Sequence, residues 1–127
     1  MRVTQQQDEV GRRFATALAA KDTDTLLAVL APEVAFRGMT PGRFWEATTP
    51  EQVVHDVLYR WFEPSDEIEE VLDVETGTAH DRPRVDYRFR VRNDAGPHLV
   101  EQRVYFDLDD QGRIARANAV CAGFRPL

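Results

Sequence analysis

The chain has 127 residues and a formal net charge of −6, from 16 basic and 22 acidic residues. This length predicts one domain, residues 1–127, that buries about two-thirds of its unfolded surface around a single core. The acidic balance argues against a nucleic-acid partner, because phosphate binding needs a basic surface. The single cysteine excludes an internal disulfide. The three histidines are scattered without ligand spacing, so no metal and no cofactor is expected.

No run of apolar residues is long enough to cross a bilayer, and the N-terminus has no signal-peptide pattern. The sequence therefore predicts a soluble protein without a membrane partner, and a cytoplasmic location.

Three helices are predicted from periodicity and capping signals. Residues 3–21 carry an apolar stripe at helical spacing. Asp22 or Thr23 is expected to cap a short second helix with an apolar body. Residues 49–52, Thr-Pro-Glu-Gln, combine a capping-box pattern with proline at the first helical position, so a third helix begins there.

Two strands and a loop are predicted around the third helix. Residues 34–38 form a short strand with Val34 and Phe36 inward, and residues 67–79 form a longer strand. The segment 39–48 holds proline, glycine and an apolar trio, which suggests a loop folded over something apolar.

The stretch 84–123 predicts three consecutive antiparallel strands. In Arg84–Arg92, apolar residues alternate with charged ones, the period-2 signature of a half-buried strand. The alternation resumes after the turn at 93–96 and again after a second turn at 109–112. Each strand therefore has one face toward the core and one toward solvent.

The register of the two hairpins tests this assignment, because opposed residues of an antiparallel pair share a face. The first hairpin should pair Val85 with Val104, Tyr87 with Gln102, and Phe89 with Val100 on the core side. On the solvent side the same register opposes Asp86 to Arg103 and Arg88 to Glu101. The second hairpin is expected to pair Phe106 with Ala115, Val104 with Ala117, Gln102 with Ala119, and Val100 with Cys121.

The order of these elements resembles the nuclear transport factor 2-like superfamily, in its SnoaL-like and ketosteroid-isomerase-like branch. The segments FATALAAKDTDTLLAVLAPEVAF and GRIARANAV carry the resemblance. It implies an α+β, cone-shaped fold: a curved antiparallel sheet wrapped around a long N-terminal helix, with two further helices. It also implies an apolar pocket inside the cone and a homodimer joined through the outer face of the sheet.

The catalytic residues of that superfamily are not matched. The positions similar to the tyrosine and two aspartates of ketosteroid isomerases hold Phe14, Gly38 and Val104, and none can exchange a proton. Where polyketide cyclases place an acid or base, Ala115, Ala117 and Ala119 are expected to face inward. Arg84 and Asp86 match the Arg-x-Asp letters of limonene-epoxide hydrolases, but the register turns both outward, and Ala119 stands at the second aspartate.

The predicted ligand-binding residues line the inside of the cone. They are Phe14, Phe36, Trp45, Tyr87, Gln102, Val104, Ala117, Ala119 and Cys121. Tyr87 and Gln102 either orient a ligand or simply hydrogen-bond each other in a packed core. Glu70, Tyr87 and Cys121 are weak catalytic candidates, and a strand bulge that exposes Glu70 to water is favoured over a buried base.

The sequence favours a protein that binds a small, largely apolar molecule. One alternative is an isomerase, cyclase or dehydratase acting on a small hydrophobic substrate. The other is a non-catalytic dimerisation or interaction module with a solid interior. In a homodimer, we expect Tyr105, Ile114, Arg116 and Val120 at the subunit contact.

Overall fold

The computed structural model describes residues 3–127, which form helices and one sheet. The helices are α1 (Gln5–Ala20), α2 (Thr23–Val29), the π-helical segment η1 (Gln52–Leu58) and its continuation α3 (Tyr59–Trp61). The strands are β1 (Leu30–Thr40), β2 (Arg43–Ala47), β3 (Glu67–Ala79), β4 (Arg82–Asn93), β5 (Gly96–Leu108) and β6 (Ile114–Pro126).

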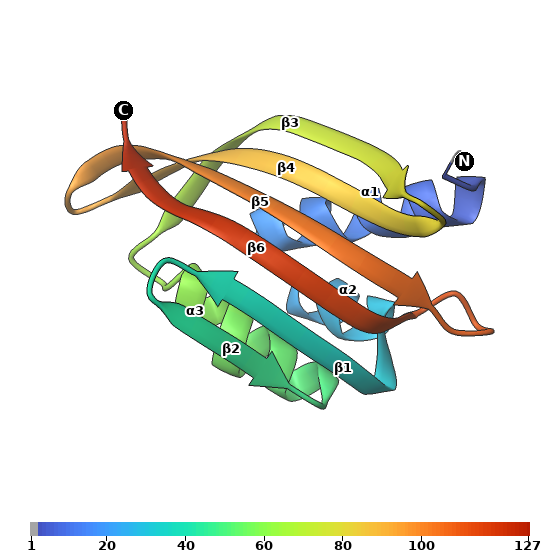
Figure 1. The fold of residues 1–127 in the computed structure, drawn as a ribbon. Coiled ribbons are helices and arrows are strands. Elements are labelled where there is room, and N and C mark those ends of the chain that lie inside the picture. Colours follow the sequence, from blue (N-terminus) through green and yellow to red (C-terminus); the bar gives the residue numbers. More distant parts are fainter. Residues whose placement is uncertain (1–2) are drawn as a thin grey trace.

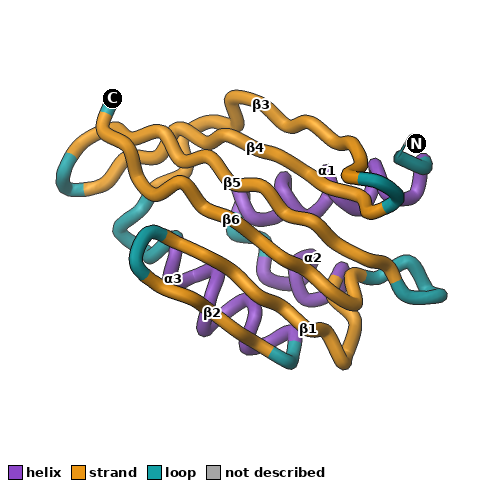
Figure 2. The backbone as a smooth tube through the Cα atoms, viewed as in Figure 1, coloured by secondary structure: helices purple, strands orange, loops and turns teal. Residues whose placement is uncertain are grey.

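The strands form one curved six-stranded sheet in the order β2-β1-β6-β5-β4-β3, and the helices lie behind it (Figure 1). Figure 2 shows the same two layers, helices on one face and open sheet on the other. The α+β cone is therefore confirmed, with one correction: β1 pairs with β6 in parallel, so the sheet is mixed. No helix within residues 3–127 is long and apolar enough to span a membrane. The cytoplasmic location stays a prediction.

The caps predicted at Asp22 and Thr49 are confirmed, and the first helix has a further cap at Thr4. Thr4 caps α1 with a full capping box, and the Asp22 side chain accepts the Thr25 N–H at the start of α2. The Thr49 hydroxyl accepts the Gln52 N–H at 3.2 Å, while the Gln52 side chain accepts the N–H of Thr48 instead of Thr49. Each cap satisfies backbone donors that a helix end leaves without partners.

The register of β4 with β5 is confirmed at every predicted pair. Val85 opposes Val104, and Tyr87 opposes Gln102. On the other face Asp86 opposes Arg103, and the Arg103 guanidinium donates to both carboxylate oxygens at 2.7 and 3.0 Å. Side-chain alternation was sufficient to predict this register, because one face of the strand pair is buried and the other carries opposed charges.

The predicted register of β5 with β6 is wrong by two residues. Ala117 lies opposite Phe106, and the same shift brings Ala119 beside Val104 and Cys121 beside Gln102. The turn is longer than predicted, because the Asp109 carboxylate accepts the N–H groups of both Gln111 and Arg113. The alanine and cysteine positions nevertheless keep their parity and still face inward.

An irregularity between Asp107 and Leu108 corrects the start of the last strand. Arg116 pairs with Asp107 and Ile114 with Leu108, which leaves Ala115 as the extra residue of a bulge. Ile114 is consequently turned inward and is 1% exposed. The expectation that Ala115 lines the interior and Ile114 lies on the outer face is therefore wrong.

Residues 39–48 do not form the expected loop. They form the end of β1, a tight turn at Pro41–Gly42 and the edge strand β2. Gly42 has φ +78°, a left-handed conformation that glycine adopts without strain. The predicted strands at 34–38 and 67–79 are confirmed inside β1 and as β3, with Val34 and Phe36 buried.

At Gly38 a side chain of the third helix packs directly on the backbone of the sheet. A Cβ atom built on Gly38 would lie 2.6 Å from the Cζ2 and Cη2 atoms of Trp61. Real Cβ contacts are not that short, so only glycine lets the Trp61 ring lie against the backbone of β1. The Phe36 and Trp45 rings lie around the indole, with centroids 6.0 and 6.2 Å away.

We predict that Gly38→Ala destabilises the protein by about 1–3 kcal/mol, the usual range for overpacking a core. Trp61→Phe removes the ring atoms that meet the new methyl group, so Gly38→Ala should cost less in that background. Urea unfolding of the four proteins of this double-mutant cycle measures the difference. Additive effects would show that the Trp61 ring does not constrain Gly38.

Candidate functional site

Two polar side chains meet on the inner face of the sheet. The Tyr87 hydroxyl and the Gln102 Oε1 atom are 2.6 Å apart, and each residue is 1% exposed. They are register partners on β4 and β5, so the strand pairing itself brings them together. Of the two alternatives that the sequence left open for this pair, the hydrogen bond within the core is present.

The hydrogen bond also fixes the orientation of the Gln102 amide. Burial, with a smaller contribution from Cys121, raises the pKa of the Tyr87 phenol well above its usual value, so the phenol stays protonated. Its O–H donates to Gln102 Oε1. The Gln102 carbonyl oxygen is the acceptor, which turns the Nε2 amide group away from Tyr87. That buried nitrogen has no hydrogen-bond partner within the described chain.

Trp61 supplies a second buried donor without a partner. The residue is 6% exposed, and its Nε1–H makes no hydrogen bond to the described residues. Trp45 provides the contrast, because its Nε1–H donates to the Thr40 hydroxyl at 2.9 Å. Native proteins satisfy nearly all buried polar groups, so two orphaned donors on one interior surface call for an explanation.

Small side chains lie between these two donors. Gly38, beneath the Trp61 ring, is the β1 neighbour of Ala119, while Gln102 is the β5 neighbour of Cys121. Ala119 and Cys121 are successive inward residues of β6. The two donors therefore flank a stretch of wall with little side-chain volume.

The other predicted ligand-binding residues also lie in the interior. Phe14, Phe36, Val104 and Ala117 are at most 2% exposed, and Trp45 is half-buried beside Trp61. Of the nine predicted residues, only Tyr87 and Gln102 border any of the surface hollows that the structure defines. The interior wall is thus largely covered by its own aromatic rings.

The structure separates the three weak catalytic candidates. Glu70 is exposed on β3, because the register with β4 shifts between Ile68 and Glu70, as favoured from the sequence. Cys121 is 7% exposed, and its sulfur accepts the Gly123 N–H at 3.4 Å. The Tyr87 side chain is buried, and its hydroxyl donates a hydrogen bond to Gln102. No carboxylate joins this cluster from the described residues.

The positions similar to superfamily catalytic residues are placed as expected. Phe14, Gly38 and Val104 all face the interior, where none can transfer a proton. Arg84 and Asp86 lie on the outer face and form an ion pair with each other, and Asp86 is also bound by Arg103. Arg84 and Asp86, the residues that match the Arg-x-Asp pattern, therefore belong to an ion-pair network on the surface.

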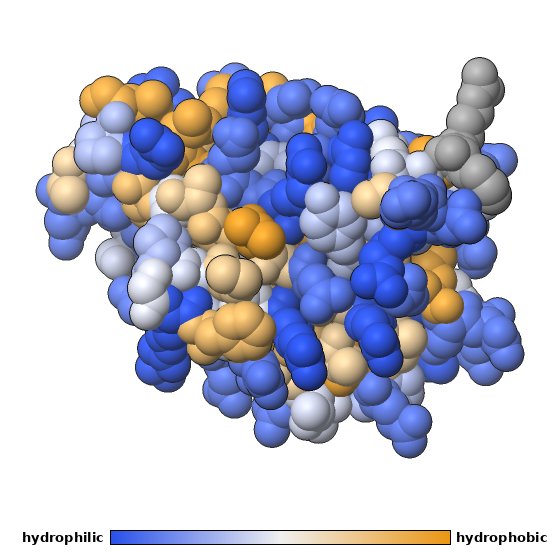
Figure 3. Space-filling view, viewed as in Figure 1, coloured by the Kyte–Doolittle hydropathy of each residue, from blue (hydrophilic) through white to orange (hydrophobic). Residues whose placement is uncertain are grey.

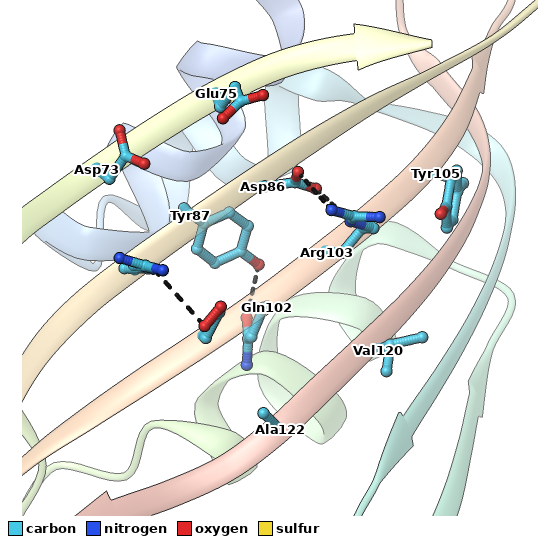
Figure 4. Close-up of a pocket in the computed structure, with 11 residues that line it drawn as sticks. Asp73, Glu75, Asp86, Tyr87, Gln102, Arg103, Tyr105, Val120 and Ala122 are labelled. Carbon is cyan, nitrogen blue, oxygen red and sulfur yellow. Dashed lines mark hydrogen bonds and ion pairs between the residues drawn. The ribbon is translucent and has the colours of Figure 1, made fainter. Parts of the chain in front are cut away.

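The outer face of β3–β6 has a shallow groove of about 470 Å³ (Figure 4). Its charged lining comprises Asp73, Glu75, Asp86, Arg88, Glu101 and Arg103, with Tyr105, Val120 and Ala122 beside them. Tyr87 and Gln102 also border it, but their side chains are 1% exposed, so only their backbone can form its floor. The groove is a wet surface crossed by ion pairs, and separate from the interior cluster.

Trp61 is the residue that the predicted site omitted. It lies on the buried side of the third helix, where an aromatic residue usually belongs to the core. The sequence signal that could have identified Trp61 was Gly38. This inward position has no side chain, so it leaves room for a large ring from the helix. His98 is also buried: it is 7% exposed, and its ring packs on Phe124.

We predict that the Tyr87 phenol makes stability fall above pH 10. Its pKa is raised on folding, so above the unfolded value of about 10 the unfolded chain loses a proton that the folded chain keeps. The stabilisation is present below that pH and is lost as pH rises toward the folded pKa. Tyr87→Phe should flatten the decline in unfolding free energy between pH 9 and 11, measured by urea unfolding. A slope equal to that of the wild type would contradict the assignment.

Comparison with known proteins gives structural relatives only. No family model matches the sequence, and neither does any curated protein. Similar solved structures include an NTF2-like protein of unknown function from Mesorhizobium loti, at 22% identity and a TM-score of 0.66, covering 94% of this chain and 93% of that one.

Two further structures carry functional names. A candidate SnoaL-like polyketide cyclase from Shewanella putrefaciens is 14% identical, with a TM-score of 0.64 and coverage of 94% and 91% of the two chains. A candidate isomerase from Bacillus subtilis is 11% identical, with a TM-score of 0.75 and coverage of 92% and 86%. At identities this low, the structural matches establish the fold alone. The chain has the nuclear transport factor 2-like fold found in SnoaL-like and ketosteroid-isomerase-like proteins.

Proposed function

We propose that this protein binds a small, largely apolar molecule on the inner face of the sheet, beside Gln102. The observation that carries the proposal is the buried Gln102 amide nitrogen, which has no partner while its carbonyl is held by Tyr87. A buried donor left unpaired costs about 1–3 kcal/mol. A bound molecule with an acceptor would recover that free energy.

Binding is favoured over catalysis by acid-base groups. Ketosteroid isomerases need ionisable residues inside the cone, and the equivalent positions here are occupied by Phe14, Gly38 and Val104. Glu70, the carboxylate that an isomerase, cyclase or dehydratase would use, is exposed on β3. The structural relatives named as a cyclase and an isomerase support a small-molecule role for the fold and do not supply the reaction.

We predict that native mass spectrometry of the purified protein detects a bound small molecule, and that Gln102→Leu loses it. The substitution keeps the volume and removes the donor. Gln111→Leu is the control, because Gln111 is exposed in the turn before β6. A mass equal to that of the bare chain in the wild-type protein, under conditions that preserve weak complexes, would count against the proposal.

A second function, as a dimerisation module, is favoured by the outer face of the sheet. Phe44, Met39 and Val120 are paired in register across β2, β1 and β6 and are 54%, 52% and 49% exposed. Figure 3 shows apolar surface over the middle of β6 and beside it over β1 and β2. We propose that a second copy of the chain covers this stripe, since exposed apolar patches mark interaction surfaces.

The stripe revises the predicted subunit contact. Tyr105, Arg116 and Val120 stay in it, because all three lie on the outer face. Ile114 does not, because it is 1% exposed within one chain. Met39 and Phe44 take its place, since the hairpin of β1 and β2 extends the outer face beyond β6.

We predict that Val120→Glu dissociates the dimer, because it would bury a charge in the subunit contact. Leu72→Glu is the matched control: Leu72 is 45% exposed but lies on β3, at the opposite edge of the sheet. Sedimentation equilibrium at high micromolar concentration should give a dimer for the wild type and for Leu72→Glu, and a monomer for Val120→Glu. A monomeric wild type would remove this function.

A further inference from the structure

We infer that Arg37, Arg116 and Asn118 form a binding site for one tetrahedral oxyanion, such as phosphate, on the outer face of the sheet. The site is separate from the proposed interior site, because these side chains lie on the other face of β1 and β6. Two observations carry the inference: a hollow over these two strands, and two arginines there that no acidic group holds.

The parallel pairing of β1 with β6 arranges the hollow. Ala35 is the register partner of Arg116, and Arg37 is that of Asn118, so the four residues form two adjacent rows. Together they line a hollow of about 340 Å³. The two arginines stand on its diagonal, their Cα atoms about 8 Å apart at the usual strand spacing and rise. Ala35 contributes only a methyl group, which leaves both long side chains free to approach one ion.

No acidic group holds either arginine within residues 3–127. Other arginines of the sheet pair with carboxylates, as Arg82 does with Asp107 at 3.5 Å. Asp107 is the cross-strand neighbour of Arg116, so its carboxylate is already engaged elsewhere. Arg37 and Arg116 form no ion pair or side-chain hydrogen bond in the described part of the chain. Their charges are therefore available to a ligand.

Two further carboxylates stand next to the site. Glu46 is the cross-strand neighbour of Arg37 on β2, and Glu33 precedes Ala35 by two residues on β1. Neither residue lines the hollow, and both are exposed to water. They lower the local positive potential without occupying the space between the two arginines.

Two guanidinium groups and one amide suit an oxyanion with several acceptor oxygens. A guanidinium group is a planar fork of N–H donors that matches phosphate or carboxylate oxygens in pairs. The Asn118 amide adds a neutral donor. Two positive charges balance a dianion, so phosphate is favoured over a singly charged carboxylate. A nucleic acid is disfavoured, because the net charge of −6 repels the remaining phosphates of a polyanion.

The inference is tested by titrating inorganic phosphate into the full-length, ¹⁵N-labelled protein and following it by NMR. Sodium chloride holds the ionic strength constant, so that general screening does not change. We expect the amide signals of residues 35–37 and 116–118 to shift and to saturate. Acetate at the same ionic strength should bind more weakly.

Substitutions at exposed positions identify the groups that hold the ion. Arg37→Gln and Arg116→Gln should each weaken phosphate binding about fivefold, the effect of losing one exposed ion pair. Arg60→Gln is the matched control, because Arg60 is an exposed arginine on α3 and its loss should leave the affinity unchanged. Glu46→Gln should tighten binding about twofold, since it removes a neighbouring negative charge.

Two results would overturn the inference. One is a shift that grows with phosphate without saturating, or an equal loss of affinity in Arg60→Gln, since either indicates general electrostatics. The other is a wild type that binds no phosphate while Arg37→Gln weakens its dimer in sedimentation equilibrium, which would assign the hollow to carboxylates of a second copy. Neither result bears on the interior ligand site, which lies on the opposite face.

Discussion

The pairing of β4 with β5 is the constraint on which the rest of the structure depends. It places Val85, Tyr87 and Phe89 on the inner face and opposes them to Val104, Gln102 and Val100. Because strand side chains alternate with a period of two, a slip of one residue would exchange the buried and charged faces of both strands. The same pairing brings the Asp86 carboxylate to Arg103 on the outside, so both faces favour one register. The inner polar cluster follows from this register, since Tyr87 and Gln102 meet as cross-strand partners.

Small residues on β1 and β6 decide what the helices can place against the sheet. Ala117, Ala119 and Cys121 have small side chains, and Gly38 has none, so the Trp61 ring of the third helix packs directly on the backbone of β1. Trp61 occupies the space over Gly38, and its N–H is left without a partner there. Glycine and alanine in a strand usually reduce the side-chain area available for packing. In this fold they make room for one large ring and for the unsatisfied donors beside it.

The two faces of the sheet have opposite chemistry, and this separates their roles. The inner face is neutral, with a buried phenol and amide, whereas the outer face carries ion pairs on β3–β5 and an apolar stripe on β6, β1 and β2. Exposed ion pairs contribute little to stability, so the charged part mainly keeps that surface in water. The apolar stripe is the part of the outer face that gains free energy when covered. The proposed ligand site on the inner face and the proposed contact with a second copy on the outer face therefore share no residues.

The sequence by itself determined the helices, every strand except β2, the side-chain parity of β4 and β5, and most of the interior. Alternation in β4 and β5, the caps at Asp22 and Thr49, and the polar pair Tyr87–Gln102 were all readable from local patterns. The exact partners of β6, the inward turn of Ile114 and the parallel pairing with β1 were decided only by the tertiary structure. A bulge or a longer turn changes register without changing local composition, and a parallel partner lies far away in the chain. The contact between Gly38 and Trp61 was also decided only by the tertiary structure. The two residues belong to different elements, and no sequence pattern within either element predicts that they pack together.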